Sequence, residues 1–389
     1  MATALSMDST FDFDTVQNRR GSHCIKWDTV PDDVIPMSIA DMDFASPPCV
    51  VEAMAARVSS GIYGYTFPPK SLTRTLLAWL DSQYGARADA DWIVPLGGIV
   101  PALAVAAQLT EGTLAAHTPN YSMLLGAPAR AGRAADLTTF PLANNDESYA
   151  IDFDALERDA PSGTGLYYLC NPHNPVGRVY DKAELERLSH IADERGWIVV
   201  SDEIHCELLF GKTHTPYWTL NNAARDHSVT FYSPGKTYNL PGIPFAFAVI
   251  PNPTLRERFV KLNYGGGMPG IFNVTAAEAA YRNGGQWRDA LLTVLRSNRD
   301  ELLRRLAVDL PLARFTKPEA TYLEWIDFRP YGLENPAAFM LEKARVALTD
   351  GKPFGGQGYA RLNFGCPRAL LDQALDRIRG ALLREGLIA

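Results

Sequence analysis

Short apolar runs alternate with amphipathic segments along the middle of the chain. Between the third and fourth of these runs, Lys182–Arg195 carries apolar residues at the spacing of an α-helix. Apolar strands that alternate with helices at intervals of about 30 residues are typical of βαβ units on a parallel sheet. The pattern therefore predicts a large α/β domain from Gly112 to about Ile250. Its strands are expected at Thr113–Ala116, Ala135–Phe140, Leu166–Cys170, Trp197–Ser201, Val229–Tyr232 and Phe245–Ile250.

Helical spacing also occurs in parts of the chain before and after this region. Residues 1–44 show few periodic signals, so we expect an arm that packs on a small domain and forms part of it. A long helical stretch begins near Ala276, is broken near Gly284–Gly285 and leads into the C-terminal part. We therefore expect a large domain over residues 45–284 and a small one over 285–389. Further helices are predicted at Pro48–Ser60, Ser71–Tyr84, Pro101–Leu109, Pro336–Val346 and Arg368–Glu385, with strands at Thr321–Trp325 and Arg361–Phe364.

Polar side chains follow three neighbouring strands of the predicted sheet, at the point where each strand ends. Asn174 lies in the turn after the third strand, Asp202 follows the fourth, and Lys236 lies in the Gly/Pro-rich turn after the fifth. Because ligands bind at the carboxyl ends of parallel strands, we expect these side chains to converge on one crevice. Each residue alone also fits a structural role: an exposed loop charge for Lys236, a helix N-cap for Asp202 and a turn residue for Asn174.

The composition mainly excludes other classes of protein. The 389 residues are 47% apolar and 21% charged, which is ordinary for a globular protein, and the length favours two domains. A net charge of −7 and a pI near 5.6, without a basic cluster, argue against a general nucleic-acid binder. No run approaches the roughly 20 apolar residues of a membrane span, and Met1–Thr10 lacks the features of a signal peptide.

The pattern of cysteines indicates the cellular compartment in which the protein is expected. They are scattered and odd in number, and no group of them has the spacing of a metal site. We therefore expect reduced thiols in a cytoplasmic protein, with no metal ligands among them. The five are Cys24, Cys49, Cys170, Cys206 and Cys366.

Several motifs in a fixed order then carry a family resemblance that covers nearly the whole chain. N-P-H-N-P-V-G at 171–177, S-D-E-I-H-C at 201–206 and S-P-G-K-T-Y-N-L at 233–240 resemble the fold type I pyridoxal-phosphate (PLP) enzymes. Within the class I/II aminotransferase family, the chain looks like the MalY/PatB-type cystathionine β-lyases, a subgroup of bacterial C–S lyases. Further matching pieces are F-D-F-D at 11–14, S-I-A-D-M-D-F at 38–44, Y-G-Y-T at 63–66, H-T-P-N-Y at 117–121 and R-L-N-F-G-C-P at 361–367.

The resemblance implies a fold and a set of roles around PLP. The fold is that of aspartate aminotransferase: α/β, with a mostly parallel seven-stranded sheet in the large domain and a smaller α+β C-terminal domain. Lys236 is expected to hold the PLP aldehyde as a Schiff base and to move the Cα proton. Asp202 is expected to keep the pyridine nitrogen protonated, and Tyr121 to stack on the ring. Asn174 and His205 are expected to bond the phenolic oxygen, although a lone histidine is more often structural.

The phosphate of PLP is expected to bind at a helix N-terminus, where backbone amides are free and the helix dipole is favourable. The matching positions are Gly98, Ile99 and Val100, with the hydroxyl of Ser233 as a further donor. Tyr65 corresponds to a tyrosine that reaches the phosphate in the neighbouring subunit. The resemblance therefore implies a homodimer whose active sites are built from both subunits.

Substrate recognition is expected to depend on Arg361, which matches the arginine that binds the α-carboxylate in a bidentate pair. A surface salt bridge is the ordinary alternative for such an arginine. Asn174 and Asp41 complete the expected substrate contacts. Two segments depart from the relatives: Gly97–Gly98 stands in place of a serine-bearing phosphate loop, and Pro241–Phe245 is apolar. These departures imply fewer phosphate contacts.

The resemblance implies β-elimination on a cysteine S-conjugate such as cystathionine, which yields a thiol, pyruvate and ammonia. Transamination uses the same Cα proton transfer, and decarboxylation or oxidative deamination of a cysteine conjugate are further alternatives. A regulator of transcription is the non-enzymatic alternative; the sequence shows no helix-turn-helix extension and no basic patch, and contact with another regulator stays open. The substrate is not fixed by the sequence, because the group on Cβ would contact loops near Asp41, Met42, Tyr63 and Gly266.

Overall fold

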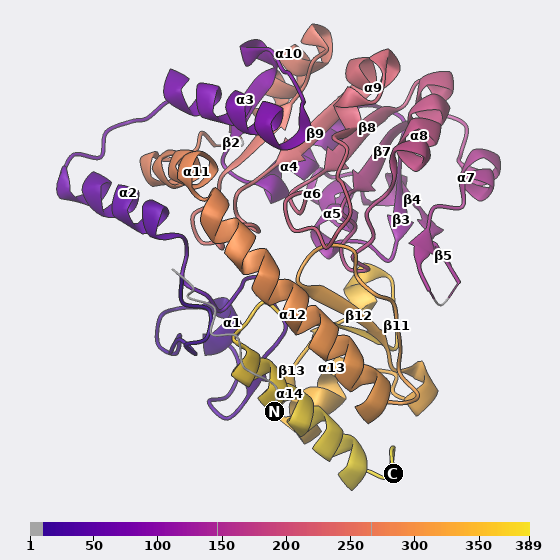
Figure 1. Ribbon diagram of the computed structural model, residues 1–389. Coiled ribbons are helices and arrows are strands. Elements are labelled where there is room, and N and C mark those ends of the chain that lie inside the picture. The colour runs from indigo at the N-terminus through magenta and orange to yellow at the C-terminus, as the bar shows by residue number, and fades with distance from the viewer. Residues whose placement is uncertain (1–10, 146, 266) are drawn as a thin grey trace.

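The computed structural model describes residues 11–145, 147–265 and 267–389 and contains a seven-stranded sheet (Figure 1). The strand order is β2-β10-β9-β8-β7-β3-β4. Neighbours from β9 to β4 pair in parallel, whereas β10 runs antiparallel to both β2 and β9. The predicted α/β fold with a mostly parallel seven-stranded sheet is thereby confirmed. The strands span β2 Ile93–Leu96, β3 Thr113–Thr118, β4 Leu137–Pro141, β7 Thr164–Cys170, β8 Ile198–Asp202, β9 Ser228–Tyr232 and β10 Ala246–Val249.

Helices cover both faces of this sheet because its side chains alternate between two apolar layers. In β7, Leu166 and Tyr168 face one layer, and Tyr167 and Leu169 face the other, as expected for a strand buried on both sides. The first layer packs against α4, α6 and α10, and the second against α7, α8 and α9. No helix in the described ranges is long and apolar enough to cross a bilayer. These helices span α4 Ile99–Ala106, α6 Ala127–Arg130, α7 Phe153–Asp159, α8 Lys182–Arg195, α9 Asn222–His227 and α10 Pro253–Leu262.

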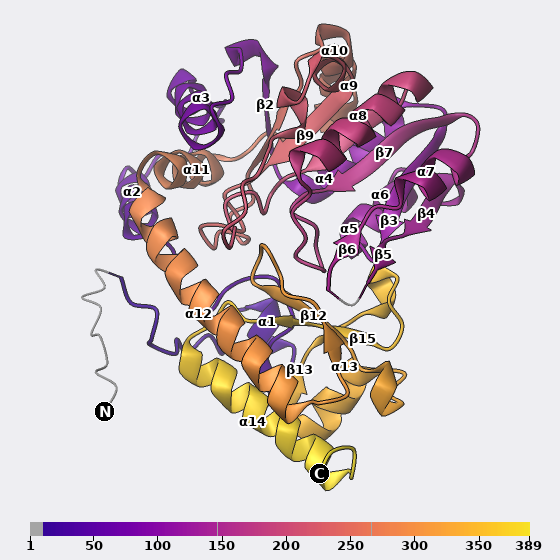
Figure 2. The same ribbon diagram turned by 45° about the vertical axis from the view of Figure 1, so that its right-hand side comes forward.

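A second, four-stranded sheet lies in the C-terminal part of the chain. Its order is β11-β12-β15-β14, and all neighbours are antiparallel. The long helix α12 (Gly285–Asp309) runs from α11 (Ile271–Asn283) down to this sheet, where it packs beside α14 (Arg368–Arg384) (Figure 2). The predicted break between α11 and α12 is confirmed at Gly284. The strands span β11 Arg314–Phe315, β12 Leu323–Asp327, β14 Thr349–Asp350 and β15 Tyr359–Asn363.

The N-terminal arm contains more regular structure than its sequence pattern predicts. It includes α1 (Ile25–Asp28) and β1 (Ile35–Pro36), and β1 pairs in parallel with β13 (Val346–Ala347) of the C-terminal part. The arm leads into α2 (Pro48–Ser59), which packs on α11. Met1–Thr10, considered above for a signal peptide, lie outside the described residues. The arm is therefore tied to the C-terminal part by strand pairing, as the expected packing on the small domain implies.

Two elements differ from the prediction, each for a local reason. The sequence pattern does not predict β2, because Pro95 interrupts its short apolar run; β2 lies at the sheet edge, where a missing N–H is tolerated. The helix predicted at Pro336–Val346 is instead α13 (Pro336–Phe339) followed by a π-helical turn at Met340–Ala344. Arg345 then takes a left-handed conformation (φ 56°), which ends the helix and allows β13 to pair with β1.

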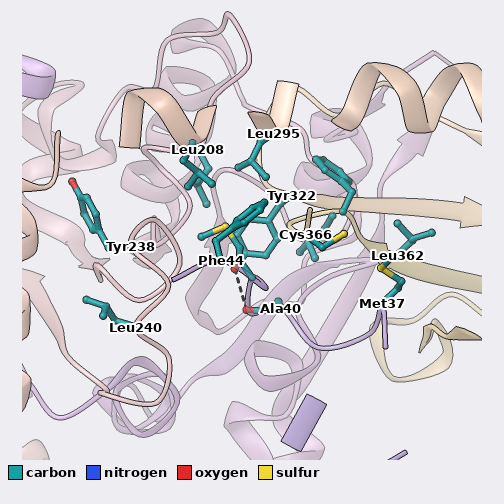
Figure 3. Packing of buried hydrophobic residues seen from close by; sticks show 14 of the residues in the cluster. Met37, Ala40, Phe44, Leu208, Tyr238, Leu240, Leu295, Tyr322, Leu362 and Cys366 are labelled. Carbon is teal, nitrogen blue, oxygen red and sulfur yellow. Dashed lines mark hydrogen bonds between the residues drawn. The ribbon is translucent and has the colours of Figure 1, made fainter. Parts of the chain in front are cut away.

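The largest apolar cluster joins the arm, the turn after β9 and the second sheet (Figure 3). At its centre, the hydroxyl of Tyr322 donates to the carbonyl oxygen of Ala40 at 3.0 Å. Burial of apolar surface contributes about 25 cal/mol per Å², so this cluster holds three distant parts of the chain together. The side chains labelled in Figure 3 are Met37, Ala40, Phe44, Leu208, Tyr238, Leu240, Leu295, Tyr322, Leu362 and Cys366.

Glu324 on β12 is a buried carboxyl group inside the C-terminal part. It is 1% exposed, and its Oε2 has no hydrogen-bond partner in the described part of the chain. Burial raises the pKa of Glu324 well above its usual range. The folded state then binds a proton that the unfolded state has already lost. The contribution of Glu324 to stability is therefore fully present below its unfolded pKa of about 4.3 and is lost as pH rises through its folded pKa.

Glu324→Gln keeps the shape of this side chain and removes its ionisation. We expect the variant to raise the free energy of unfolding at pH 8 by about 1–3 kcal/mol, because no buried carboxyl group has to stay protonated or become charged. Near pH 4 the effect should be small, because the wild-type carboxyl group is neutral there. Urea denaturation at both pH values measures the difference, and an equal effect at pH 4 and pH 8 would contradict the interpretation.

Candidate active site

The segments that follow β8 and β9 line a pocket of about 380 Å³. Asp202 is the last residue of β8, Lys236 lies in the turn after β9, and Asn174 lies in the turn after β7. The structure thus brings the three strand-end residues together, as the sequence pattern predicts. The pocket is lined by Gly97, Gly98, Ile99, Val100, Pro101, Tyr121, Ile204, Ser233, Gly235, Lys236, Leu240, Pro241, Pro244 and Phe245.

Lys236 presents a half-buried amine to this pocket. Its Nζ donates to the carbonyl oxygen of Ala40 at 2.6 Å. Burial lowers the pKa of Lys236 to about 8, and the positive charge of Arg361 acts in the same direction. A substantial fraction of the amine is therefore neutral near physiological pH, as a nucleophile or a base requires.

Asp202 is buried, with 2% of its surface exposed, and its charge acts on Lys236. Its Oδ1 accepts a 3.3 Å hydrogen bond from the backbone N–H of Ile204. Burial raises the pKa of Asp202 to about 7, although this N–H and the charge of Lys236 oppose the shift. The residues after Asp202 form turns and no helix, so the N-cap alternative does not apply. A cationic donor placed in the pocket would find an acceptor here.

Arg361 enters from β15 and contacts Asn174 across the two parts of the chain. Its Nη1 donates to Asn174 Oδ1 at 3.1 Å, and its Nη2 lies 3.3 Å from the carbonyl oxygen of Ser38. The guanidinium stacks over the ring of Phe354, and its Nε has no partner in the described residues. Burial lowers the pKa of Arg361 to about 10. The Arg361 guanidinium is 4% exposed and has no carboxylate partner in the described part, so it is suited to bind an anion. The alternative of a surface salt bridge therefore does not apply.

His205 and Tyr121 complete the polar surroundings of the pocket. Both ring nitrogens of His205 are buried without a hydrogen-bond partner in the described ranges. Burial lowers the pKa of His205 well below its usual range, and the charges of Lys236 and Arg361 lower it further, so the ring is neutral. Tyr121 precedes α5 (Ser122–Leu125) and lines the pocket; burial, with a smaller contribution from Asp202, raises its pKa to about 12.

The first turn of α4 supplies backbone amides to the pocket wall. Gly98 is the N-cap of α4 and has φ 152°, a conformation that favours glycine, and Ile99 and Val100 begin the helix. Free N–H groups and the helix dipole make this end suitable for an anion. Ser233 also lines the pocket, but its hydroxyl donates to the carbonyl oxygen of Phe245 at 2.7 Å and would have to turn to bind a ligand.

Several expected site residues do not line the pocket. Asp202, His205 and Arg361 are close enough to Lys236 for their charges to interact, and Asn174 is hydrogen-bonded to Arg361. Tyr65 is fully exposed in the coil between α2 and α3 (Lys70–Tyr84). Asp41 lies next to Ala40, and its Oδ2 accepts from Arg19 at 2.6 Å, so the arm already uses this carboxylate. Gly266 lies outside the described residues. The structure therefore places neither Tyr65 nor Asp41 in the lining of this pocket.

Sequence reasoning missed the residues that fix the arm against Lys236. Asn239 accepts from Met42 N at 2.9 Å and donates to Met42 O at 2.9 Å and Phe44 O at 2.8 Å. Asn363 donates to the carbonyl oxygens on both sides of Ala40. Both asparagines occur within the motifs that carry the resemblance, but the sequence pattern shows no sign of contacts across about 200 to 320 positions.

These features define a class of protein: an α/β enzyme with a lysine, a carboxyl group and an anion-binding arginine at the carboxyl edge of a parallel sheet. Residues 32–378 match the family model described as Aminotransferase class I and II, and the chain belongs to this family. It is 38% identical to cystathionine beta-lyase PatB of Bacillus subtilis, over 95% of this chain and 99% of that protein. It is 30% identical to protein MalY of Escherichia coli (strain K12), over 96% of this chain and 99% of that protein.

Among solved structures, the chain resembles cystalysin from Treponema denticola, which contains a pyridoxal 5'-phosphate cofactor. The TM-score is 0.92 at 31% identity, and the match covers 97% of this chain and 100% of cystalysin. The pocket residues fit this cofactor on their own chemistry. Lys236 offers a partly neutral amine, Asp202 a buried carboxyl group, His205 two nitrogens without a partner in the described residues, and α4 a helix N-terminus for the phosphate.

Asn239 offers a test of how the arm is held at the site. It has φ 53°, so Asn239→Gly keeps the backbone conformation and removes only the side-chain hydrogen bonds, at an expected cost of about 1–3 kcal/mol in unfolding free energy. Asn239→Ala should be less stable than the glycine variant by about 1 kcal/mol, because alanine is strained in the left-handed region. Urea denaturation of both variants measures the two effects, and equal stability of Ala and Gly would contradict the strained backbone.

Proposed function

We propose that the chain is a PLP-dependent C–S β-lyase that cleaves cystathionine or another cysteine S-conjugate to a thiol, pyruvate and ammonia. The observation that carries the proposal is the position of the Lys236 amine near the buried side chains of Asp202 and Arg361. The near full-length similarity to cystathionine beta-lyase PatB supports elimination as the outcome.

The substrate is held by groups that the fold has already fixed. Arg361 binds the α-carboxylate, and Asn174, which accepts from its Nη1, orients the guanidinium. PLP, when bound, supplies an electron-withdrawing ring that makes the Cα proton acidic. Lys236 removes that proton; the electron pair of the Cα–H bond forms a Cα–Cβ double bond, and the Cβ–S bond breaks with its electrons on sulfur. Water then converts the three-carbon product into pyruvate and ammonia.

The remaining pocket residues are proposed to hold the cofactor. Asp202 would bind the pyridine nitrogen, Tyr121 would stack on the ring, and His205 and Asn174 would bond the phenolic oxygen. Both nitrogens of His205 lack partners in the described part, and a bound oxygen that accepts from one of them would remove part of the cost of burying them unsatisfied. The full set of proposed PLP contacts is Gly98, Ile99, Val100, Tyr121, Asn174, Asp202, His205, Ser233 and Lys236.

We also propose that the enzyme is a homodimer, in which Tyr65 reaches the phosphate in the partner subunit. The coil that carries Tyr65 exposes several large apolar side chains, an arrangement that favours burial against a second copy. Ile62 and Phe67 are 76% and 77% exposed, and Tyr65 makes no contact with the pocket of its own subunit. Such a site would be incomplete in a monomer.

Two further assignments rest on broader features. All five cysteines are free thiols, which supports a cytoplasmic location. The two separate sheets support a large domain over residues 45–284 and a small domain over 285–389, with 1–44 as an arm that joins the small domain. Asp41 is proposed to contribute to the substrate side of the site, because it neighbours the Ala40 carbonyl that holds Lys236.

Product analysis tests the reaction directly. The PLP-loaded protein, incubated with L-cystathionine without a keto-acid acceptor, should form pyruvate, ammonia and thiol in equal amounts over many turnovers. Lys236→Ala should lower kcat by a factor on the order of 10³, because the Cα proton then has no positioned base. One equivalent of pyridoxamine phosphate without pyruvate would instead identify a transaminase. Release of CO₂ or uptake of O₂ would identify the decarboxylating or oxidative alternative.

Subunit mixing tests the shared site. Tyr65→Ala and Lys236→Ala chains should each be weakly active, whereas their mixture should recover up to about a quarter of the wild-type activity. In a hybrid dimer, one of the two sites has both its own Lys236 and an intact tyrosine from the other subunit. Mixing Lys236→Ala with Asn174→Ala is the matched control, because both changes damage the site of their own subunit. Equal activity of both mixtures would contradict the sharing of Tyr65.

A further inference from the structure

The carbonyl oxygen of Ala40 receives two hydrogen bonds at the edge of the active site. Lys236 Nζ donates to it at 2.6 Å, and the hydroxyl of Tyr322 donates to it at 3.0 Å. The second of these bonds is drawn in Figure 3. The three residues come from the turn after β9, the segment before β12 and the arm. Tyr322 and the amine of Lys236 therefore share one hydrogen-bond acceptor, the carbonyl oxygen of Ala40.

The Ala40 carbonyl is held in this direction by its neighbours. The side-chain amide of Asn363 donates to Ile39 O at 2.6 Å and to Asp41 O at 2.7 Å, and the backbone N–H of Asp41 donates to Ile39 O at 2.9 Å. Lys26 Nζ also donates to Asp41 O, at 3.0 Å. The carbonyls on either side of Ala40 are thus fixed by other partners, and the Ala40 oxygen itself is directed at Lys236 and Tyr322.

Two donors that share one carbonyl oxygen compete for its electron density. A carbonyl acceptor favours the ammonium form of lysine, because only the donor's charged form gains the stronger hydrogen bond. The Tyr322 hydroxyl directs its positive hydrogen at the same oxygen and weakens this preference. Tyr322 is buried, and burial raises its pKa far above its usual range, so it remains a donor at every working pH.

We propose that Tyr322 is a positioning residue that acts through the Ala40 carbonyl, directing the amine of Lys236 and easing its release as the neutral base. The inference rests on the proposed function only in taking Lys236 as the cofactor-linked lysine. The other charged or titratable groups that face Lys236 are Arg361 from β15, Asp202 from β8, Asp41 from the arm and His205 from the turn after β8. Replacing Tyr322 by phenylalanine leaves all four in place.

Capture of PLP by the full-length, cofactor-free chain measures the effect without any substrate. The neutral amine adds its lone pair to the aldehyde carbon, a carbon–nitrogen double bond forms, and the aldehyde oxygen leaves as water. The pH midpoint of the capture rate therefore reports the protonation of Lys236. Tyr322→Phe should raise this midpoint by about 0.5 unit, so that capture at pH 7 slows about threefold. The thermal midpoint of unfolding, measured in parallel, reports whether the fold is intact.

Tyr331→Phe is the matched control, because it removes a buried hydroxyl that accepts from Leu312 N and shares no hydrogen bond with the site. Its capture midpoint should equal that of the wild type. A folded Tyr322→Phe chain with an unchanged midpoint would overturn the inference.

Asn363→Ala provides a second variant in case Tyr322→Phe does not fold. It frees the flanking carbonyls, so the Ala40 oxygen loses its direction and the midpoint should fall. A midpoint that does not fall in this folded variant would likewise overturn the inference. The lyase proposal is judged separately by pyruvate formation: a wild type without pyruvate but with a Tyr322-dependent midpoint would reject the lyase and keep the role of Tyr322.

Discussion

The ionisable groups of Lys236, Asp202 and Arg361 lie close enough to interact. In the described part of the chain none of them has an ion-pair partner within 4 Å. Burial acts against each charge: it raises the pKa of Asp202 to about 7 and lowers the pKa values of Lys236 and Arg361 to about 8 and 10. Burying unpaired charges costs free energy that the rest of the fold must offset. The two sheets, the arm and the long helix α12 are all needed to hold these groups within reach of one another.

The C-terminal part is fixed to the loop of Asn174 by direct contacts rather than by apolar packing alone. Glu319 pairs with Arg178 at 2.8 Å and accepts from the backbone N–H of Val179 at 2.9 Å. Gly177 allows this approach, because a Cβ there would lie 2.5 Å from the Cβ of Pro318. The loop that carries Asn174 is therefore held against the part of the chain that carries Arg361. The hydrogen bond between Arg361 and Asn174 is a consequence of this contact, and it gives the guanidinium of Arg361 a defined orientation.

The strand-end residues could be predicted from the sequence because a parallel sheet collects its carboxyl ends at one edge. This principle alone brings Asn174, Asp202 and Lys236 together, whereas Arg361 required the family resemblance because it enters from another sheet. The contacts of Asn363 with the arm could not be predicted, since no local pattern marks a partner more than 300 residues away. Edge strand β2 was not predicted for a different reason. Pro95 interrupts its short apolar run, and a strand tolerates proline only at the edge of a sheet.

The cost of burying Asp202 and Lys236 depends on pH. Asp202 has a raised folded pKa, so its contribution to stability is present below about 3.9 and is lost as pH rises through about 7. Lys236 has a lowered folded pKa, so its contribution is present above about 10.4 and is lost as pH falls through about 8. Between pH 7 and 8 both losses are nearly complete, so the two groups together contribute least to stability there. A ligand that brings a cation to Asp202 and uses the amine of Lys236 in a covalent bond removes both costs in that range, and binding to the folded state alone stabilises it by mass action. The burial of Asp202 and Lys236 thus favours a ligand with this order of charges.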